Sequence, residues 1–355
     1  MHLLDRLFGL VSPREKFFVD GWGDPAVLPS DAPVELARLR PARIGLRLTP
    51  IGRVRGGRLL EGHFESPEPR LPPAARTARV RLLVPPGKAR GIAVHLAASG
   101  DEGFRFRQLL AAPLLARGIG ALILENPFYG SRRPPGQPTY AVRCVSDLQL
   151  MAAATVQEAR ALLRWLRETG AAPLLGVTGY SMGGQLAAMV GQATRFPLAV
   201  VPVAPSCSPV SVFEEGVLRE VARWSALGPG PEEARRALCR HLSRFSVKAL
   251  PPPRAPEAAI VVGTAEDGVV PPAEMRKIAD HWGCELRWLP AGHVSAVLLH
   301  REAIRQAIAD AFERLERGRH AGPGPSGRRR PMKNGERRAG LFERGSVRRS
   351  PRIAL

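Results

Sequence analysis

Long apolar runs are absent from this chain of 355 residues, and cysteine is scarce. No stretch of 18 or more apolar residues occurs, so the sequence predicts no transmembrane helix. The first eleven residues lack a cationic stretch and a small-residue cleavage site, which argues against a secretory signal. The four cysteines show neither metal-ligand spacing nor a disulfide-framework pattern. We therefore expect a cytoplasmic protein with reduced thiols and no metal or organic cofactor.

Negative charge is also scarce, since 32 Asp and Glu face 52 Lys and Arg, for a net charge of +20. Half of this excess lies in residues 317–355, where 12 Lys and Arg stand against two Asp and Glu. The segment is rich in Gly, Pro, Ser and Arg and has few apolar residues to bury, which is typical of disorder. We expect a basic disordered tail over 318–355 that either stays solvated or contacts polyanions or anionic membranes, without specific nucleic-acid recognition.

The rest of the sequence changes its pattern near residue 77. Short β-like runs separated by Pro and Gly predict an N-terminal extension with antiparallel edge strands over 1–76. Strand and helix patterns then alternate over 77–317, which predicts a mostly parallel central sheet with helices on both faces. Two helical patches interrupt the alternation at about 205–256 and are interpreted as a small lid insertion. The expected strands are 42–48, 57–64, 77–84, 91–96, 120–124, 174–178, 198–203, 258–262 and 285–289, and the expected helices are 104–117, 145–168, 185–192, 272–282 and 294–317.

A pentapeptide of the form G-x-S-x-G occupies residues 179–183, between an apolar run and a helical segment. A serine at such a strand-to-helix corner lies on a strained turn that lifts its hydroxyl out of the sheet. The main-chain N–H of Met182 then points to where a carbonyl oxygen becomes an oxyanion. We interpret Ser181 as a nucleophile, with a plain turn serine as the alternative. Together with the strand–helix alternation, this motif predicts an α/β-hydrolase fold.

A serine hydroxyl needs a base, and in this fold the base is a histidine that follows the acid in chain order. His293 stands in a loop between the last expected strand and the closing helix, which is the topological place for the base; a histidine with only a structural role at the helix N-terminus is the alternative. His241 falls in the insertion and His281 within a helix, so we expect packing or surface roles for both.

The acid that orients the histidine is expected at the carboxyl end of a preceding strand. Glu266 and Asp267 are adjacent there, and we favour Asp267 because it has a D-x-x-V-P setting and a shorter side chain. Its expected role is to fix the tautomer of His293 and stabilise its cation. A second oxyanion donor is expected from the small residues of loop 95–101, with Ala97 the first choice and Ala98 the second.

Substrate contacts are expected from two further segments. Tyr129 lies on the proline-rich loop 126–138, together with Arg132 and Arg133, which either attract an anionic group or belong to a solvated loop. Phe213 and Trp224 belong to an apolar stripe at helical spacing in the insertion, which either packs the lid onto the domain or contacts an acyl chain.

Several segments resemble the alpha/beta-hydrolase-domain-containing protein eighteen family. They are Gly21-Trp22-Gly23, His95-Leu96-Ala97 with Gly100-Asp101, Leu124-Glu125-Asn126-Pro127-Phe128-Tyr129-Gly130, Gly179-Tyr180-Ser181-Met182-Gly183-Gly184, Val212-Phe213-Glu214-Glu215-Gly216-Val217-Leu218 with Trp224, and Gly292-His293-Val294-Ser295. The resemblance covers roughly residues 17–300. Loop 97–100 departs from it, since Gly and Thr are expected there, and this places the oxyanion assignment in doubt.

The resemblance implies a serine hydrolase that acts on acyl esters such as lipids. An esterase or lipase-like activity on a small-molecule or lipid acyl ester is therefore the leading expectation. A peptidase or amidase with the same triad is one alternative, because the motif does not distinguish esters from amides. A non-catalytic binding protein that keeps the fold and uses its basic tail is the other.

Overall fold

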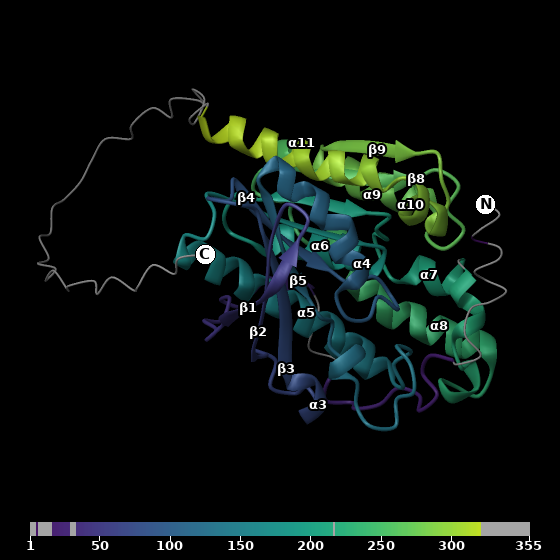
Figure 1. The fold of residues 1–355 in the computed structure, drawn as a ribbon. Coiled ribbons are helices and arrows are strands. Elements are labelled where there is room, and N and C mark those ends of the chain that lie inside the picture. Colours follow the sequence, from purple (N-terminus) through teal and green to yellow (C-terminus); the bar gives the residue numbers. More distant parts are fainter. Residues whose placement is uncertain (1–4, 6–15, 29–32, 216, 321–355) are drawn as a thin grey trace, which may run out of the picture.

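The computed structural model describes residues 5, 16–28, 33–215 and 217–320 (Figure 1). Within these residues a nine-stranded sheet forms the centre, in the order β1-β2-β3-β5-β4-β6-β7-β8-β9. The strands are β1 (Arg47–Val54), β2 (Gly57–Glu65), β3 (Thr77–Val84), β4 (Gly91–Leu96), β5 (Ile119–Leu124), β6 (Leu174–Tyr180), β7 (Ala199–Val203), β8 (Ile260–Thr264) and β9 (Glu285–Leu289).

The sheet has an antiparallel edge and a parallel centre. The pairs β1–β2, β2–β3 and β3–β5 are antiparallel. From β5 to β9, each neighbouring pair is parallel. Strands β4 to β8 are buried along their whole length, which is typical of parallel strands covered on both faces. The predicted mostly parallel α/β sheet is confirmed.

Helices cover the two faces of the sheet. On one face, α5 (Val145–Thr169) packs against α6 (Met182–Ala193). On the other, α11 (Arg301–His320) crosses β6, β7 and β8 and contacts α4 (Arg105–Ala111), as Figure 1 shows. The helix α9 (Pro272–Trp282) packs on β8. Because the central strands are parallel, the loops after β4, β6, β8 and β9 meet at one edge of the sheet.

The segment between β7 and β8 carries α7 (Val210–Glu214), α8 (Pro231–Leu242) and several short 3₁₀ turns. N-terminal residues pack against it. The N–H of Phe17 donates to the carbonyl of Val221 at 2.7 Å, and the N–H of Arg223 donates to the carbonyl of Phe17 at 2.9 Å. The ring of Phe18 is fully buried in the same apolar cluster. A further N-terminal helix, α2 (Pro33–Arg38), contacts α6.

Several elements differ from the sequence-based expectation, among them α2, which was not predicted. β1 covers Arg47–Val54 rather than 42–48; it is an edge strand exposed along most of its length, so burial imposes no apolar pattern on it. The short helix α3 (Pro73–Arg76) was not predicted. The closing helix is two helices, α10 (His293–Leu299) and α11, because His300 leaves the helical region at φ −113° and ψ 23°.

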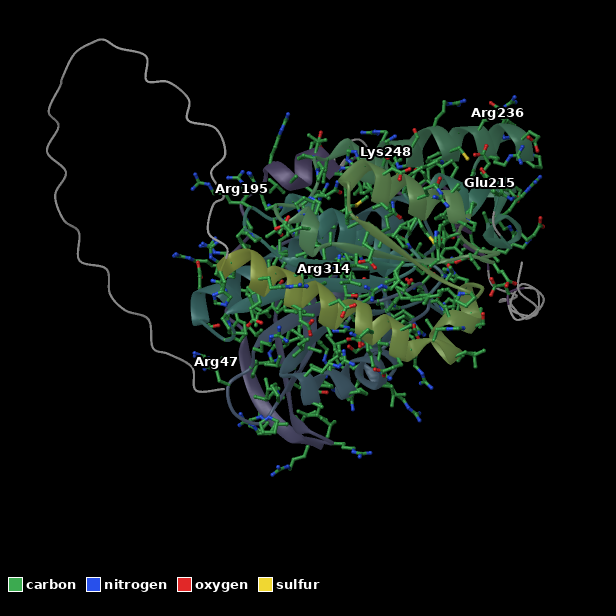
Figure 2. The ribbon with its side chains drawn as sticks, turned by 90° about the horizontal axis from the view of Figure 1, so that it is seen from above. Arg47, Arg195, Glu215, Arg236, Lys248 and Arg314 are labelled. Atoms are coloured by element: carbon green, nitrogen blue, oxygen red, sulfur yellow. The ribbon has the colours of Figure 1, made fainter. Side chains whose placement is uncertain are left out.

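Charged side chains are distributed over the outside of the fold (Figure 2). The labelled side chains of Arg47, Arg195 and Arg236 project at well-separated places around its outline, and all three are exposed. This is the usual arrangement of solvated charge on a protein surface. The basic tail was expected over 318–355. Its first three residues, 318–320, belong to α11, and the remainder, 321–355, lies outside the described residues.

Candidate active site

The turn between β6 and α6 carries Ser181 in a conformation that non-glycine residues rarely adopt. β6 ends at Tyr180 and α6 begins at Met182, and Ser181 between them has φ 57° and ψ −121°. Its N–H donates to the carbonyl of Val203 on β7 at 2.8 Å, which fixes the turn to the neighbouring strand. Such backbone strain persists only where the surroundings hold it in place, and it is concentrated at functional sites.

Two glycines make this turn sterically possible. A Cβ on Gly179 would lie 2.2 Å from the carbonyl oxygen of Gly183. A Cβ on Gly183 would lie 2.6 Å from the carbonyl oxygens of Leu96 and Ala97. A larger residue at 179 would therefore clash within the turn, and one at 183 would push the turn away from the end of β4, which explains the two glycines of the G-x-S-x-G motif.

The structure brings Ser181, His293 and Asp267 together. The Nε2 atom of His293 lies 2.9 Å from the Oγ atom of Ser181, and its Nδ1 atom lies 2.7 Å from the Oδ2 atom of Asp267. The three residues follow β6, β9 and β8 at the carboxyl edge of the parallel strands. A tautomer that donates from Nδ1 to Asp267 leaves Nε2 free to accept the serine proton.

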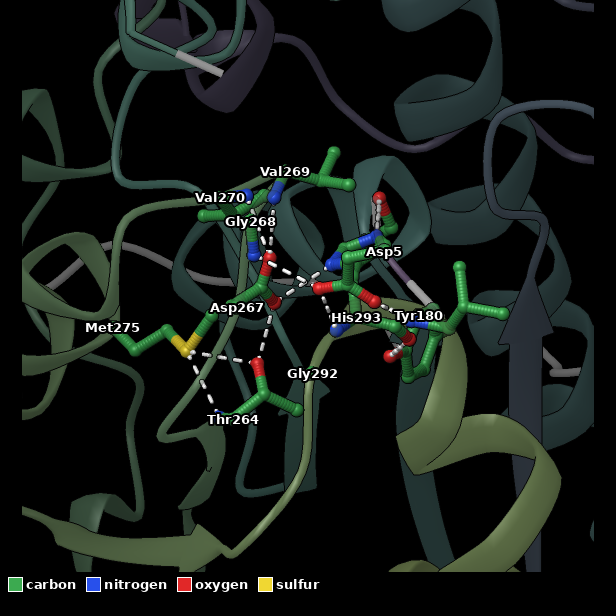
Figure 3. Close-up of polar contacts among 12 residues, drawn as sticks. Asp5, Tyr180, Thr264, Asp267, Gly268, Val269, Val270, Met275, Gly292 and His293 are labelled. Carbon is green, nitrogen blue, oxygen red and sulfur yellow. Dashed lines mark hydrogen bonds and ion pairs between the residues drawn. The ribbon is translucent and has the colours of Figure 1, made fainter. Parts of the chain in front are cut away.

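The carboxylate of Asp267 is buried and surrounded by donors (Figure 3). Its Oδ1 atom accepts from the N–H groups of Val269 and Val270, each at 2.8 Å. Its Oδ2 atom accepts from the hydroxyl of Thr264 at 2.5 Å, in addition to His293. These bonds compensate the cost of burying the charge and hold the carboxylate in one orientation. Glu266, the alternative acid, is exposed.

Tyr180 contacts His293 through both its hydroxyl and its ring. Its hydroxyl donates to the carbonyl oxygen of His293, and the two rings lie edge to face with centroids 5.2 Å apart. Burial, followed by the charges of Asp267 and Asp5, raises the pKa of Tyr180 well above its ordinary value, so the hydroxyl keeps its proton. This contact was not predicted, although Tyr180 lies inside the recognised motif.

Three other histidines of the expected hydrolase domain, His95, His241 and His281, lie in different surroundings. The Nε2 atom of His241 lies 2.9 Å from the Oε1 atom of Gln149, and that of His281 lies 2.8 Å from the carbonyl oxygen of Leu250. His95 on β4 is fully buried, and desolvation, aided by the charge of Arg107, lowers its pKa to about 3. Its ring is therefore neutral at physiological pH.

The loop after β4 is held by a buried ion pair that the sequence did not reveal. The Nε atom of Arg107 lies 2.7 Å from the Oδ2 atom of Asp101, and the same guanidinium donates to the carbonyl of His95 at 3.3 Å. Ala97 is buried with its carbonyl against Gly183, whereas Ala98 and Ser99 line the cavities beside Ser181. Of the two expected donors, Ala98 therefore lines a cavity that Ser181 also lines, whereas Ala97 is in neither cavity wall.

Two cavities open on Ser181. One is an apolar cavity of about 110 Å³ between the sheet, α5, α6 and the insertion, and the other is a more open cavity of about 580 Å³ between α4 and α10. Tyr129 and Phe213 line the apolar cavity, together with Phe17, Met151, Leu186 and Met189. Trp224 does not line the apolar cavity. Its indole N–H donates to the carbonyl of Arg219 at 3.0 Å, and its ring packs against the apolar cluster that contains Phe18.

The two arginines near Tyr129 are not pocket residues. Arg132 is 1% exposed, and its two terminal nitrogens lie 2.9 and 2.6 Å from the carboxylate of Glu158 on α5. It also donates to the carbonyls of Ala75 and Glu125. Arg133 pairs with Glu102. Both interpretations of Arg132, as an anion-attracting or a solvated side chain, are therefore wrong: it joins the loop to α5 in the interior.

Among the described residues, no three or more His, Cys, Asp or Glu side chains are grouped so that they could hold a metal ion. Within the same residues, the helices are too short or too polar to cross a membrane.

The nine-stranded sheet and the turn at Ser181 define a protein of the α/β-hydrolase fold. Residues 15–234 and 228–314 match the sequence profile of the family described as alpha/beta hydrolase domain containing 18, and the chain belongs to that family.

Known proteins with similar folds include two acetyl xylan esterases. The enzyme from Paenibacillus sp. R4 superposes with a TM-score of 0.56 at 16% identity, over 87% of this chain and 99% of its own. Acetyl xylan esterase 1 from Thermoanaerobacterium sp. JW/SL YS485 gives 0.55 at 14% identity, over 88% and 99%. At this identity the likeness concerns the fold.

A relative by sequence is the uncharacterized protein Rv2627c of Mycobacterium tuberculosis. It is 26% identical over 205 residues, which are 55% of this chain and 46% of the relative. The match thus spans about half the length of that protein.

Proposed function

We propose that this protein is a serine hydrolase that cleaves acyl esters through Ser181, His293 and Asp267. The observation that carries the proposal is the continuous chain of contacts from Oγ of Ser181 to His293 at 2.9 Å and from His293 to Asp267 at 2.7 Å. A nucleophile, a base and an orienting acid in this geometry are the requirements of acyl transfer to serine.

In the proposed reaction, the Oγ atom of Ser181 attacks the acyl carbonyl while Nε2 of His293 takes its proton. The carboxylate of Asp267 stabilises the resulting imidazolium without taking the proton. The N–H groups of Met182 and, by its place on the cavity wall, Ala98 are assigned to the oxyanion. His293 then returns the proton to the leaving alcohol, and water, activated by the same histidine, releases the acid from Ser181.

The two cavities favour an ester with unlike halves. The cavity of about 110 Å³ is lined mainly by Met, Leu, Ala and Phe side chains, and suits the acyl group. Since an apolar protein cavity of roughly 150 Å³ holds benzene, this volume corresponds to an acyl chain of about four carbons. The open cavity of about 580 Å³, with Asp101, Glu102 and Arg105 in its wall, suits a larger and more polar alcohol.

A fluorophosphonate probe tests the nucleophile. It should label the wild type and leave Ser181→Ala unlabelled, and hydrolysis of p-nitrophenyl butyrate should fall by about 10⁴-fold or more in that variant. The control is Ser225→Ala, which removes an exposed serine of the insertion and should change neither result. Labelling that survives Ser181→Ala would remove Ser181 from the mechanism. A higher turnover on aminoacyl anilides than on esters would instead identify an amidase.

A further inference from the structure

Asp5 is a buried carboxylate that the mechanism above does not use. It is fully buried, and its Oδ2 atom accepts from the N–H groups of Gly268 at 2.9 Å and His293 at 2.7 Å. Its Oδ1 atom accepts from the N–H of Val294 at 2.9 Å. Figure 3 shows Asp5 beside His293, on the same group of dashed contacts that includes Asp267.

The partners of Asp5 are significant because of where they lie in the chain. Gly268 directly follows Asp267, and the other two donors are His293 itself and the next residue. One carboxylate therefore joins the loop that carries the acid to the loop that carries the base. These loops follow different strands, β8 and β9, so a bridge between them fixes the distance over which Asp267 and His293 meet.

The negative charge of Asp5 contributes to the proposed role in addition to its hydrogen bonds. A buried carboxylate is costly unless donors surround it, and the three N–H groups supply charge-assisted bonds. One of these groups is the N–H of His293, so the carboxylate is hydrogen-bonded to the residue that carries the base. By Coulomb attraction, a negative charge on this residue stabilises the positive charge that the ring acquires when Ser181 gives up its proton.

We propose that Asp5 is a positioning residue, whose carboxylate holds the loops of Asp267 and His293 together and whose charge favours the imidazolium. The proposal rests on the proposed hydrolase function. It adds to the three catalytic residues a fourth residue and a second carboxyl group, contributed from 262 positions before Asp267 in the chain.

The substitution Asp5→Asn removes the negative charge and leaves the size of the side chain nearly unchanged. It keeps one oxygen acceptor, removes the negative charge and places an amide N–H₂ against main-chain donors. We expect kcat/KM to fall about 10- to 100-fold, because small displacements of reacting groups are costly. We also expect the acid limb of the pH profile of kcat/KM to move to lower pH, since the variant lacks a negative charge that opposes loss of the imidazolium proton.

The shift of the acid limb is specific because the other groups facing the imidazole are unchanged in this variant. They are Asp267, Tyr180 and Ser181, and in the wall of the open cavity Asp101, Glu102 and Arg105. Asp20→Asn is the matched control: it removes another N-terminal carboxylate, which is about half exposed and paired with Arg143, and should move neither rate nor limb. An Asp5→Asn enzyme with the wild-type pH profile would overturn the proposal.

A second measurement does not depend on catalysis. In hydrogen exchange, the amides of Gly268, His293 and Val294 should exchange faster in Asp5→Ala than in the wild type, while those of β6 keep their protection. Unchanged protection at all three amides would overturn the proposal even in an inactive protein. Failure of the wild type to react with the fluorophosphonate would instead count against the hydrolase function. The exchange result would still decide whether Asp5 holds the two loops together.

Discussion

The size of the apolar cavity makes a quantitative prediction about acyl length. Each methylene that moves from water into an apolar site contributes about 0.8 kcal/mol, which is about a fourfold change in kcat/KM. A cavity of about 110 Å³ admits roughly four carbons before it is full. In a series of p-nitrophenyl esters from acetate to decanoate, kcat/KM should therefore rise about fourfold per carbon as far as butyrate or valerate and then fall.

Two substitutions in the cavity wall should move this optimum in opposite directions. Met189 is buried in the wall, and Met189→Ala removes three heavy atoms, so the preferred chain should lengthen by about two to three carbons. Ala152→Leu places three additional carbons in the same space and should shift the preference to acetate. The opposite signs matter, because a general loss of stability would lower the rate with every ester alike.

The control for this series is Leu109→Ala. Leu109 lines the open cavity and is 52% exposed, so its truncation should leave the acyl preference unchanged. A rate that rises steadily through decanoate, or an optimum that neither Met189→Ala nor Ala152→Leu moves, would show that the acyl chain does not occupy this cavity.

Three further predictions concern the triad acid, the interior and the tail. Asp267→Asn should lower kcat by about 10⁴-fold, whereas Glu266→Gln, which changes an exposed neighbour, should not; equal losses would leave the identity of the acid open. Glu158→Gln should lower the free energy of unfolding by about 3–5 kcal/mol in urea titrations, because Arg132 would remain buried without its partner, and a change below about 1 kcal/mol would contradict this. Deletion of 321–355 should leave ester hydrolysis intact and abolish salt-sensitive retention on heparin; retained binding would place the polyanion contact on the folded part.

The parts of the fold that the sequence predicted correctly are those in which burial imposes a pattern. The expected strands 77–84 and 91–96 coincide with β3, of which five of eight residues are buried, and β4, which is buried throughout. β1 was misplaced because none of its eight residues is buried and six are exposed, and its register shifts between Pro50 and Gly52. The closing helix was merged because a single non-helical residue, His300, leaves no mark on apolar periodicity.

The candidate site likewise contains some residues that the sequence indicates and others that only the fold reveals. Ser181 is recognisable from a local motif, and Asp267 and His293 from their places after successive strands, so chain order alone brings them to one edge. Arg132 was misread because its partner Glu158 is on a helix 26 residues away, and only the fold shows that the pair is enclosed. Asp5 and Tyr180 act on main-chain atoms of the triad loops, and such contacts have no signature in residue spacing.

The wall of the apolar cavity also combines distant parts of the chain. Phe17 and Phe213 both line this cavity, and their ring centroids lie 6.4 Å apart. The ring centroid of Phe18 lies 5.6 Å from that of Phe213. The expected boundary near residue 77 follows a change in sequence pattern, whereas this wall draws on residues from both sides of it. Phe17 is tied to the insertion by two main-chain hydrogen bonds, so any movement of the insertion must carry the N-terminal residues with it. Together with the bonds from Asp5 to the loops of Asp267 and His293, this makes residues that precede the sheet part of the apolar cavity beside Ser181 and of the support for these two loops.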